Sequence, residues 1–304
     1  MPIKLSKEMK PKISIVIGTY NLLAKLKLVL DSFNNQNFDL ALTELIIVDS
    51  SSSDGTIDFF ENKKYNFNFK FITQKNKGKA AARNRGIKEA RADLIMITDA
   101  DMIAHPDLVK SHYELQEEND FDIIVEGKTW VLNSENLPVE NYLRRPYITH
   151  KVKHKQKLDF YYCLTGNLSM PKTYFVDNDY FDEEYQSYGW EDVDLGYRLI
   201  RKQKKKILYS DLAQNYHFHV WSSYQEIERR FDMGKSVHRF IKKFPELKQF
   251  LGINSVNHFI YRIFSRKEKT IQRWMAVLLS EKHLSKIKKT ILREYYYYKG
   301  YRSI

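Results

Sequence analysis

The chain has 304 residues, of which 43% are apolar and 29% are charged, and its formal net charge is +12. This balance is typical of a globular protein with a sizeable core, built as one large or two ordinary domains. The single cysteine, Cys163, excludes an internal disulfide framework and a multi-cysteine zinc site, and it suits a reducing compartment.

The first hundred residues alternate between strand and helix patterns. Strands are predicted at 13–17, 45–48, 69–72 and 94–98, and helices at 22–34, from about residue 55, and at 78–90. Short links between such elements indicate a mostly parallel sheet with helices on both faces. Ligands of these sheets bind beyond the carboxyl ends of the strands, where Thr19, Asp49 and Asp99 can meet.

The remainder is less regular. Further strands are predicted at 121–130 and 161–170, a helix at 191–201, and short extended pieces at 207–210 and 213–219. From Tyr224 the pattern is helical to the end. No internal repeat and no obvious linker marks a sharp boundary.

Asp99-Ala100-Asp101 directly follows the apolar run at 94–98. Neighbouring carboxylates repel each other unless a cation lies nearby, and hard oxygen ligands suit Mg²⁺ or Mn²⁺. A divalent ion held there could carry a nucleotide diphosphate. Alone, the triplet is more typical of a solvated turn at a strand end.

Two common nucleotide signatures are absent. No G-x-G-x-x-G follows the first strand, and neither Gly127-Lys128-Thr129 nor Gly234-Lys235-Ser236 has the upstream glycine of a phosphate-binding loop. A parallel sheet with a D-x-D triplet but without these signatures points to sugar nucleotides.

Several segments together resemble the family 2 glycosyltransferases, which have a GT-A fold. They occur in order at 14–21 (SIVIGTYN), 46–49 (IIVD), 53–56 (SDGT), 76–78 (NKG), 82–86 (ARNRG) and 99–101 (DAD). Residues 188–198 (YGWEDVDLGYR) resemble the acceptor-side segment of galactosyl- and N-acetylgalactosaminyltransferases. The resemblance covers roughly residues 12–240.

The resemblance implies an α/β GT-A fold, a mostly parallel Rossmann-like sheet flanked by helices, with a helical C-terminal extension. The catalytic domain would span 1–240, with a nucleotide-binding half at about 12–103 and an acceptor-binding half at 104–240. Residues 241–304 would form the basic extension.

The resemblance also implies a donor site. Thr19, Tyr20 and Asp49 would bind the uracil and ribose of a UDP-sugar, with Asp49 accepting a hydrogen bond from the uracil imide. Asp49 is also a suitable cap or turn residue. Ser50 stands where many relatives have a second acid, which lowers the local negative charge.

Cations and a metal would hold the diphosphate. Arg83 and Lys77 would face it, although Lys77 also fits a solvated helix face. Asp99 would meet the ribose or a metal-bound water. The implied cofactor is Mn²⁺ or Mg²⁺, ligated by Asp101 and by one of two histidines: His219 is favoured over His217 by the following Val220-Trp221.

The acceptor-side segment carries the implied catalytic base. Asp192 would take the proton from the acceptor hydroxyl, and Glu191 would bind acceptor hydroxyls. Acids in a first helical turn are also ordinary partners of the helix dipole. Trp190 offers a flat face to a sugar ring, but a buried tryptophan is equally compatible with the pattern. For Asp194, support of the loop is a sufficient role.

The charge is concentrated at the C-terminus, where residues 265–304 hold eleven Lys/Arg and three Asp/Glu, a net +8. An apolar stripe in this region either lies on an acidic membrane or packs as a helical cap. No window is apolar enough to cross a membrane, and Met1 to Lys12 is polar, unlike a secretory signal. A cytoplasmic protein, soluble or peripheral on the inner face of the membrane, is expected.

The resulting hypothesis is a metal-dependent, inverting glycosyltransferase. It would move a sugar from a UDP-sugar to a hydroxyl of a glycan or lipid-linked glycan, in surface polysaccharide or glycoconjugate synthesis. Galactose or N-acetylgalactosamine is favoured, with glucose or N-acetylglucosamine as alternatives. A nucleotidyltransferase, a nucleic-acid-binding protein and a silent glycan-binding relative are the competing interpretations; no nucleic-acid partner is expected.

Overall fold

The computed structural model describes residues 10–62, 65, 67–148, 152–185, 188–280 and 284–304. Most of the polar N-terminal stretch considered above therefore lies outside the described residues. The chain forms two compact units. The larger contains the residues up to Glu183 together with Glu191–Val220, and the smaller contains Glu184–Trp190 and Trp221–Ile304.

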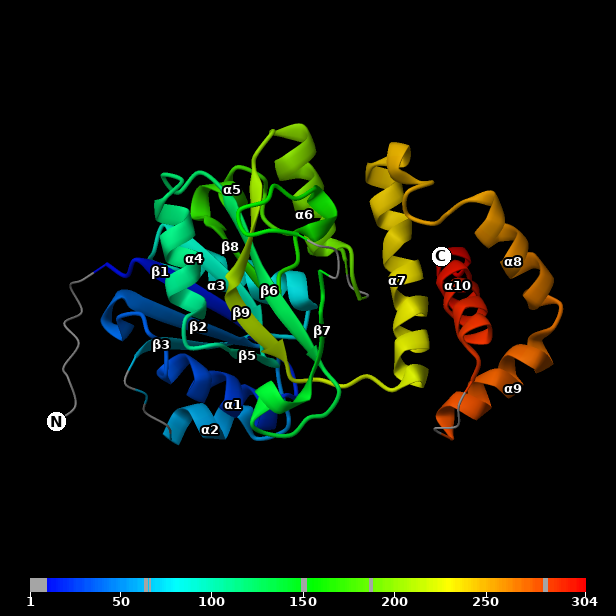
Figure 1. The fold of residues 1–304 in the computed structure, drawn as a ribbon, viewed down its shortest axis with the longest axis horizontal. Helices are drawn as coiled ribbons and strands as arrows, with labels where there is room; N and C mark the ends of the chain where they lie inside the picture. Colours follow the sequence, from blue (N-terminus) through cyan, green and yellow to red (C-terminus); the bar gives the residue numbers. More distant parts are fainter. Residues whose placement is uncertain (1–9, 63–64, 66, 149–151, 186–187, 281–283) are drawn as a thin grey trace. The chain divides into compact units, whose positions relative to one another are not determined.

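A single mixed sheet organises the larger unit (Figure 1). Its strands are β1 Ile13–Thr19, β2 Thr43–Asp49, β3 Asn68–Thr73, β4 Leu94–Asp99, β5 Met102–Ala104, β6 Ile124–Leu132, β7 Leu143–Pro146, β8 Asn167–Pro171 and β9 Ile207–His217. The order is β3-β2-β1-β4-β8-β6-β9-β5, with β7 paired to β6. The first four strands are parallel, as the alternating pattern predicts, whereas β8, β5 and β7 pair antiparallel with their neighbours.

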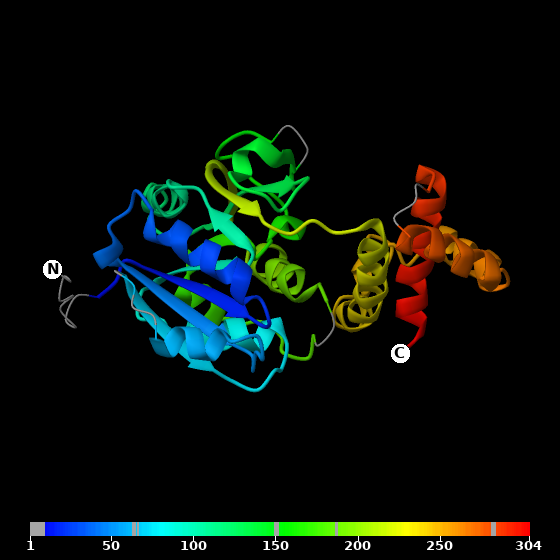
Figure 2. The ribbon, with the colours of Figure 1, turned by 90° about the horizontal axis from the view of Figure 1, so that it is seen from below.

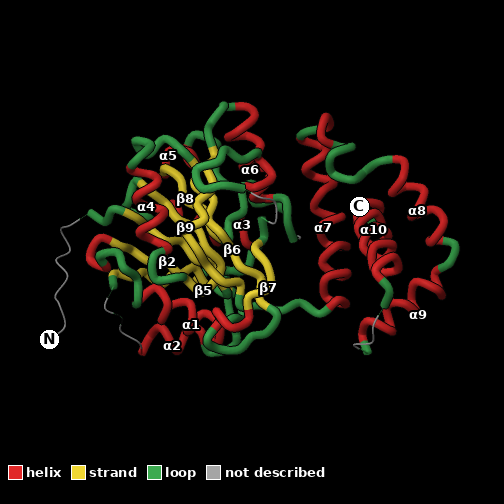
Figure 3. The backbone as a smooth tube through the Cα atoms, viewed as in Figure 1, coloured by secondary structure: helices red, strands yellow, loops and turns green. Residues whose placement is uncertain are grey.

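Helices cover both faces of the sheet (Figure 3). In the larger unit they are α1 Leu23–Asn34, α2 Thr56–Asn62, α3 Lys79–Glu89, α4 Leu108–Glu117, α5 Lys172–Val176 and α6 Glu191–Tyr197. Short turns of 3₁₀ helix lie at η1 Leu40–Leu42, η2 Val139–Tyr142 and η3 Phe160–Tyr162, and a π-helical turn, η4 Arg198–Lys202, continues α6.

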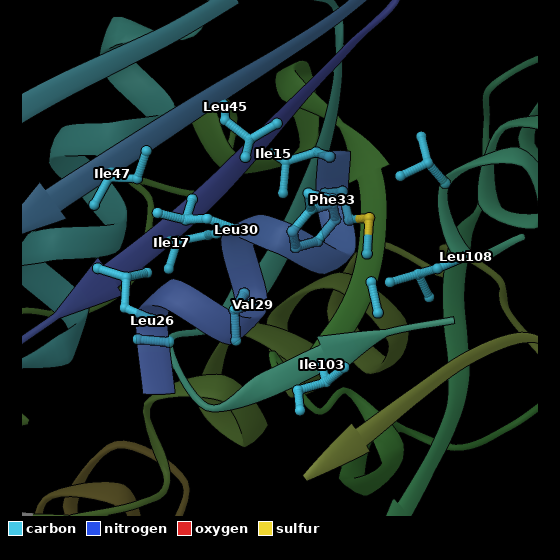
Figure 4. Packing of buried hydrophobic residues seen from close by; sticks show 14 of the residues in the cluster. Ile15, Ile17, Leu26, Val29, Leu30, Phe33, Leu45, Ile47, Ile103 and Leu108 are labelled. Atoms are coloured by element: carbon cyan, nitrogen blue, oxygen red, sulfur yellow. The ribbon is translucent and has the colours of Figure 1, made fainter. Parts of the chain in front are cut away.

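Strand alternation explains why both faces are buried. On one face of β1, Ile15 and Ile17 meet Leu30 and Phe33 of α1, all essentially inaccessible to solvent (Figure 4). On the other face α3 approaches so closely that a Cβ on Gly86 would lie 2.4 Å from a methyl carbon of Val16. The sheet is thus held between helices, and its strand ends are left to form a site.

Three predicted elements differ from the structure. Of the strand predicted at 161–170 only β8 forms, because the N-terminal part folds into η3 and a loop. The two short pieces predicted at 207–219 join into one strand, β9, whose pairing with β6 shifts register between Gly127 and Lys128. Strand β5 and helix α4 were not predicted at all.

The smaller unit is helical (Figure 2). It contains α7 Ser223–Lys243, η5 Pro245–Leu247, α8 Ser255–Ser265, α9 Glu268–Leu279 and α10 Lys286–Arg302. Helices α7 and α10 cross at Gly234 and Gly300, where a Cβ on either would lie 2.0 Å from a backbone oxygen of the other helix. The apolar stripe expected within 265–304 includes Ile271, Leu278, Leu284 and Ile287. The first three are buried here, whereas Ile287 is exposed.

The compact units divide the chain at Val220 rather than at residue 240. The reason is physical: α7 packs along α10 and so belongs with the helices that follow it. The proposed division into a catalytic domain and an extension stays a prediction about function.

Candidate functional site

The ends of β1, β2 and β4 lie side by side, so the residues expected to meet do so. Thr19 and Asp49 are direct partners in the β1–β2 register, and Asp99 pairs with Gly18 across β1 and β4. The buried Thr19 hydroxyl has no hydrogen-bond partner among the described residues, and Tyr20 beside it is half exposed. An unpaired buried hydroxyl at a strand end is what a bound polar group would satisfy.

Asp49 forms a turn in this structure. Its carboxylate is fully buried and accepts hydrogen bonds from the backbone N–H of Ser52 at 2.9 Å and from the Ser52 hydroxyl. The turn role that the sequence leaves open is therefore present. Its contact with a nucleotide base remains a prediction, as does that of Lys77, which is exposed.

Arg83 is buried at the ends of the strands. Its guanidinium lies between two carboxylates, 2.9 Å from Asp99 Oδ1 and 2.8 Å from Glu191 Oε1. Arg83 lies on α3, and its long side chain reaches both Asp99 at the end of β4 and Glu191 at the start of α6. Arg83 therefore holds these two carboxylates in place, and any contact between Arg83 and a diphosphate stays a prediction.

Lys79 is a cation that sequence reasoning missed. It is the first residue of α3, follows Gly78 at φ +88°, and places its exposed Nζ 3.8 Å from Asp99 Oδ2. Burial alone would raise the pKa of Asp99, but the charges of Lys79 and Arg83 outweigh it and hold that pKa well below its usual range. Asp99 is thus ionised at neutral pH.

Asp101 meets both candidate histidines, because β5 pairs antiparallel with β9 and sets Met102 opposite His217. Asp101 Oδ2 lies 3.4 Å from His217 Nε2 and 4.0 Å from His219 Nδ1. The other ring nitrogen of His217 is hydrogen-bonded to the Tyr147 hydroxyl, whereas His219 Nδ1 is 2.8 Å from Lys25 Nζ.

The donor types fit a divalent cation. A carboxylate oxygen and an imidazole nitrogen are common protein ligands of Mn²⁺. A hydroxyl bonded to the second imidazole nitrogen fixes the ring, and substrate phosphates and water could complete the coordination. Among the residues that the structure describes, no three His, Cys, Asp or Glu side chains form a ready-made metal cluster.

The acidic pair opens α6 after an unusual turn. Gly189 and Trp190 both have positive φ, +89° and +78°, which is rare for an aromatic residue. Asp192 Oδ1 then accepts from the Val193 N–H at 2.8 Å. Burial, followed by the charge of Glu191, raises the pKa of Asp192 to about 7 while Arg83 opposes the shift.

The neighbours of this pair have supporting positions. Asp194 is buried and bonded at 2.6 Å to Arg198, whose guanidinium also donates to the backbone carbonyls of residues 178 and 180. The indole N–H of Trp190 donates to the Met233 carbonyl at 2.9 Å within the smaller unit. Trp190 is therefore a half-buried structural residue, and stacking on a sugar stays a prediction.

Glu126 is a second residue that sequence reasoning missed. It lies in β6, is buried, and accepts from the Leu164 N–H at 3.0 Å. Burial, reinforced by the nearby Asp192 charge, raises the pKa of Glu126 well above its usual value. The only signal in the sequence is a glutamate ending the apolar run 123–125.

The sequence comparison decides the family. The family model described as "Glycosyl transferase family 2" matches residues 14–175, more than half of the chain. The chain belongs to glycosyl transferase family 2. Its fold is of the GT-A type.

Named relatives support this assignment. The chain is 27% identical over 224 residues to chondroitin synthase of Pasteurella multocida, and 30% identical over 237 residues to the uncharacterized glycosyltransferase YfnE of Bacillus subtilis. Each match covers 62% of this chain, but only 23% and 60% of those relatives, respectively.

Solved structures share the fold. Staphylococcus aureus TarS in complex with UDP superposes with a TM-score of 0.56 at 19% identity, covering 96% of this chain and 91% of that one. A mannosyltransferase from Pyrobaculum calidifontis with GDP-Man and Mn²⁺ gives a TM-score of 0.62 at 16% identity, covering 97% and 87%. None of the described helices is long and apolar enough to cross a membrane.

Proposed function

We propose that this glycosyltransferase moves a sugar from a UDP-sugar to a hydroxyl of a glycan or lipid-linked glycan, with inversion and with help from Mn²⁺ or Mg²⁺. The observation that carries the proposal is the Arg83 bridge, which ties Asp99 at the end of β4 to Glu191 at the start of α6. One buried cation thereby joins the expected donor-binding corner to Glu191, the residue next to the expected base Asp192.

Asp192 has the chemistry of the base. With a pKa of about 7 it is substantially ionised at neutral pH yet basic enough to accept a proton. It would take the acceptor hydroxyl proton as that oxygen attacks the anomeric carbon. A single displacement of this kind inverts the anomeric centre.

Asp101 and one histidine would hold the metal, which as a Lewis acid stabilises the charge of the departing diphosphate. The sequence favours His219, but the geometry favours His217. His217 directs Nε2 toward Asp101 while Tyr147 fixes its other nitrogen, whereas His219 lies against the Lys25 ammonium. A neighbouring cation disfavours binding of a second one.

The donor sugar is proposed from similarity alone. The segment 189–194 favours galactose or N-acetylgalactosamine, while a TarS structure in complex with UDP-GlcNAc, at a TM-score of 0.54, makes N-acetylglucosamine a direct competitor. A UDP-release assay with Mn²⁺ across a panel of UDP-sugars, with GDP-mannose included, tests the proposal. Absence of both UDP release and UDP binding by calorimetry would overturn it.

We further propose that the helical unit can rest on acidic lipid, as part of a cytoplasmic enzyme acting at the inner face of the membrane. Helix α8 exposes Val256 and Phe259, and residues 265–304 carry a net +8. Salt-sensitive sedimentation with anionic but not neutral vesicles is expected. Equal behaviour with both vesicle types would contradict the idea.

A further inference from the structure

The larger unit has a basic cluster that lies away from the residues assigned above. Residues 152–157 and 201–206 together contain eight Lys/Arg and no Asp/Glu. The described members of the two segments meet around a cavity of about 620 Å³. This volume lies within the range of small-molecule pockets.

Cations, tyrosine rings, apolar side chains and one carboxylate line this pocket. Lys157, Lys204 and Arg201 supply positive charge, and Tyr161 and Tyr162 supply adjacent rings with centroids 4.5 Å apart. The carboxylate, Asp159, is paired with Arg201, so these two charges offset each other. Lys157 and Lys204 are exposed and have no acidic partner among the described residues, so their charge is available to a ligand.

The pocket is connected to the catalytic centre by one continuous helical segment. Asp192 is the second residue of α6, η4 continues this helix, and Arg201 lies nine residues after Asp192. At helical rise this is on the order of 13 Å. A chain-like acceptor with its reacting end at Asp192 could therefore reach the pocket with a more distant unit.

We propose that this pocket, lined by Lys157, Tyr161, Tyr162, Arg201 and Lys204, binds a distal unit of an anionic glycan acceptor. The inference rests on the proposed function and names its substrate class. Cations recognise carboxylate or phosphate groups, and the tyrosine rings pack on the apolar face of a sugar ring.

Other anionic partners fit less well. A lipid surface is best met by an exposed apolar face with cations around it, whereas this cavity is concave and its exposed ring is a tyrosine. A nucleic acid requires a continuous basic groove, and this cluster is local. The carboxylate of a uronic acid and the phosphodiester of a polyol-phosphate chain share the required chemistry and are separated by experiment.

The test measures oligosaccharide binding to the full chain by calorimetry. The probes are a hyaluronan hexasaccharide, a ribitol-phosphate hexamer and neutral chitohexaose. Wild type is expected to bind one anionic probe more tightly than the neutral one, and less tightly at high salt. The double variant Lys157→Ala/Lys204→Ala is expected to lose about tenfold or more in affinity for that probe.

A matched control removes the same charge elsewhere. Lys27→Ala/Lys110→Ala takes two exposed lysines from α1 and α4 and is expected to leave the affinity unchanged. Tyr161→Ala is expected to weaken binding without changing the charge. An equal loss in both double variants would overturn the inference, as would equal binding of neutral and anionic probes, or pocket-dependent binding of anionic vesicles or RNA but of no oligosaccharide.

UDP binding with Mn²⁺ is measured on the same samples. Retained UDP binding without oligosaccharide binding refutes the pocket while leaving the proposed function intact. Absent UDP binding in wild type refutes the proposed function itself.

Discussion

Arg83 provides the sharpest test of the site. Arg83→Met removes the buried cation between Asp99 and Glu191 but keeps much of the apolar volume. Breaking a buried ion pair from one side costs about 3–5 kcal/mol, because the remaining charge is left unpaired. At about 2–4 °C per kcal/mol for a unit of this size, the larger unit would melt about 6–20 °C lower.

Arg85 supplies the control within the same helix. Its side chain is 54% exposed and pairs with Glu89 on the surface, so Arg85→Met should change the free energy of unfolding by no more than about 0.5 kcal/mol. Thermal unfolding followed by circular dichroism compares the two. A loss in Arg83→Met no larger than in Arg85→Met would refute the buried bridge.

The same substitution should alter the pH dependence of transfer. Arg83 lowers the pKa of Asp192, so its removal raises that pKa. Because the base acts when ionised, the acidic limb of the rate profile should move to higher pH. Adding Glu191→Gln removes one unpaired carboxylate and should restore part of both the stability and the profile; purely additive effects would exclude this coupling.

Three further predictions follow from the same geometry. Asp192→Asn should reduce kcat by about 10²–10⁴-fold with UDP affinity unchanged in calorimetry, and loss of UDP binding instead would move Asp192 to the donor site. Glu126→Gln should raise the free energy of unfolding and flatten its pH dependence: the buried acid stays protonated in the folded state, so stability falls by up to about 1.4 kcal/mol per pH unit between its ordinary pKa and its raised one. Urea unfolding at several pH values measures this, and an unchanged slope would contradict it. His217→Ala should weaken Mn²⁺-supported UDP binding more than His219→Ala does, and the reverse order would restore His219.

Much of the fold follows from local pattern. Apolar runs bounded by turn residues correctly located β1 to β4, since consecutive parallel strands with short connections leave few alternatives. Strand β5, by contrast, has only three residues and no periodicity to detect. It forms because β9 offers it a partner more than a hundred residues away.

The sequence by itself determined the family, the alternating sheet, and the presence of Thr19, Asp49 and Asp99 at neighbouring strand ends, because these depend on local order and on parallel pairing. Only the tertiary structure decided how the charges are distributed among them. It buried Arg83 between two carboxylates, brought both His217 and His219 within 4.0 Å of Asp101, and gathered two distant lysine-rich segments around one pocket. Burial, register and charge pairing depend on residues far apart in the chain, and no local pattern records them.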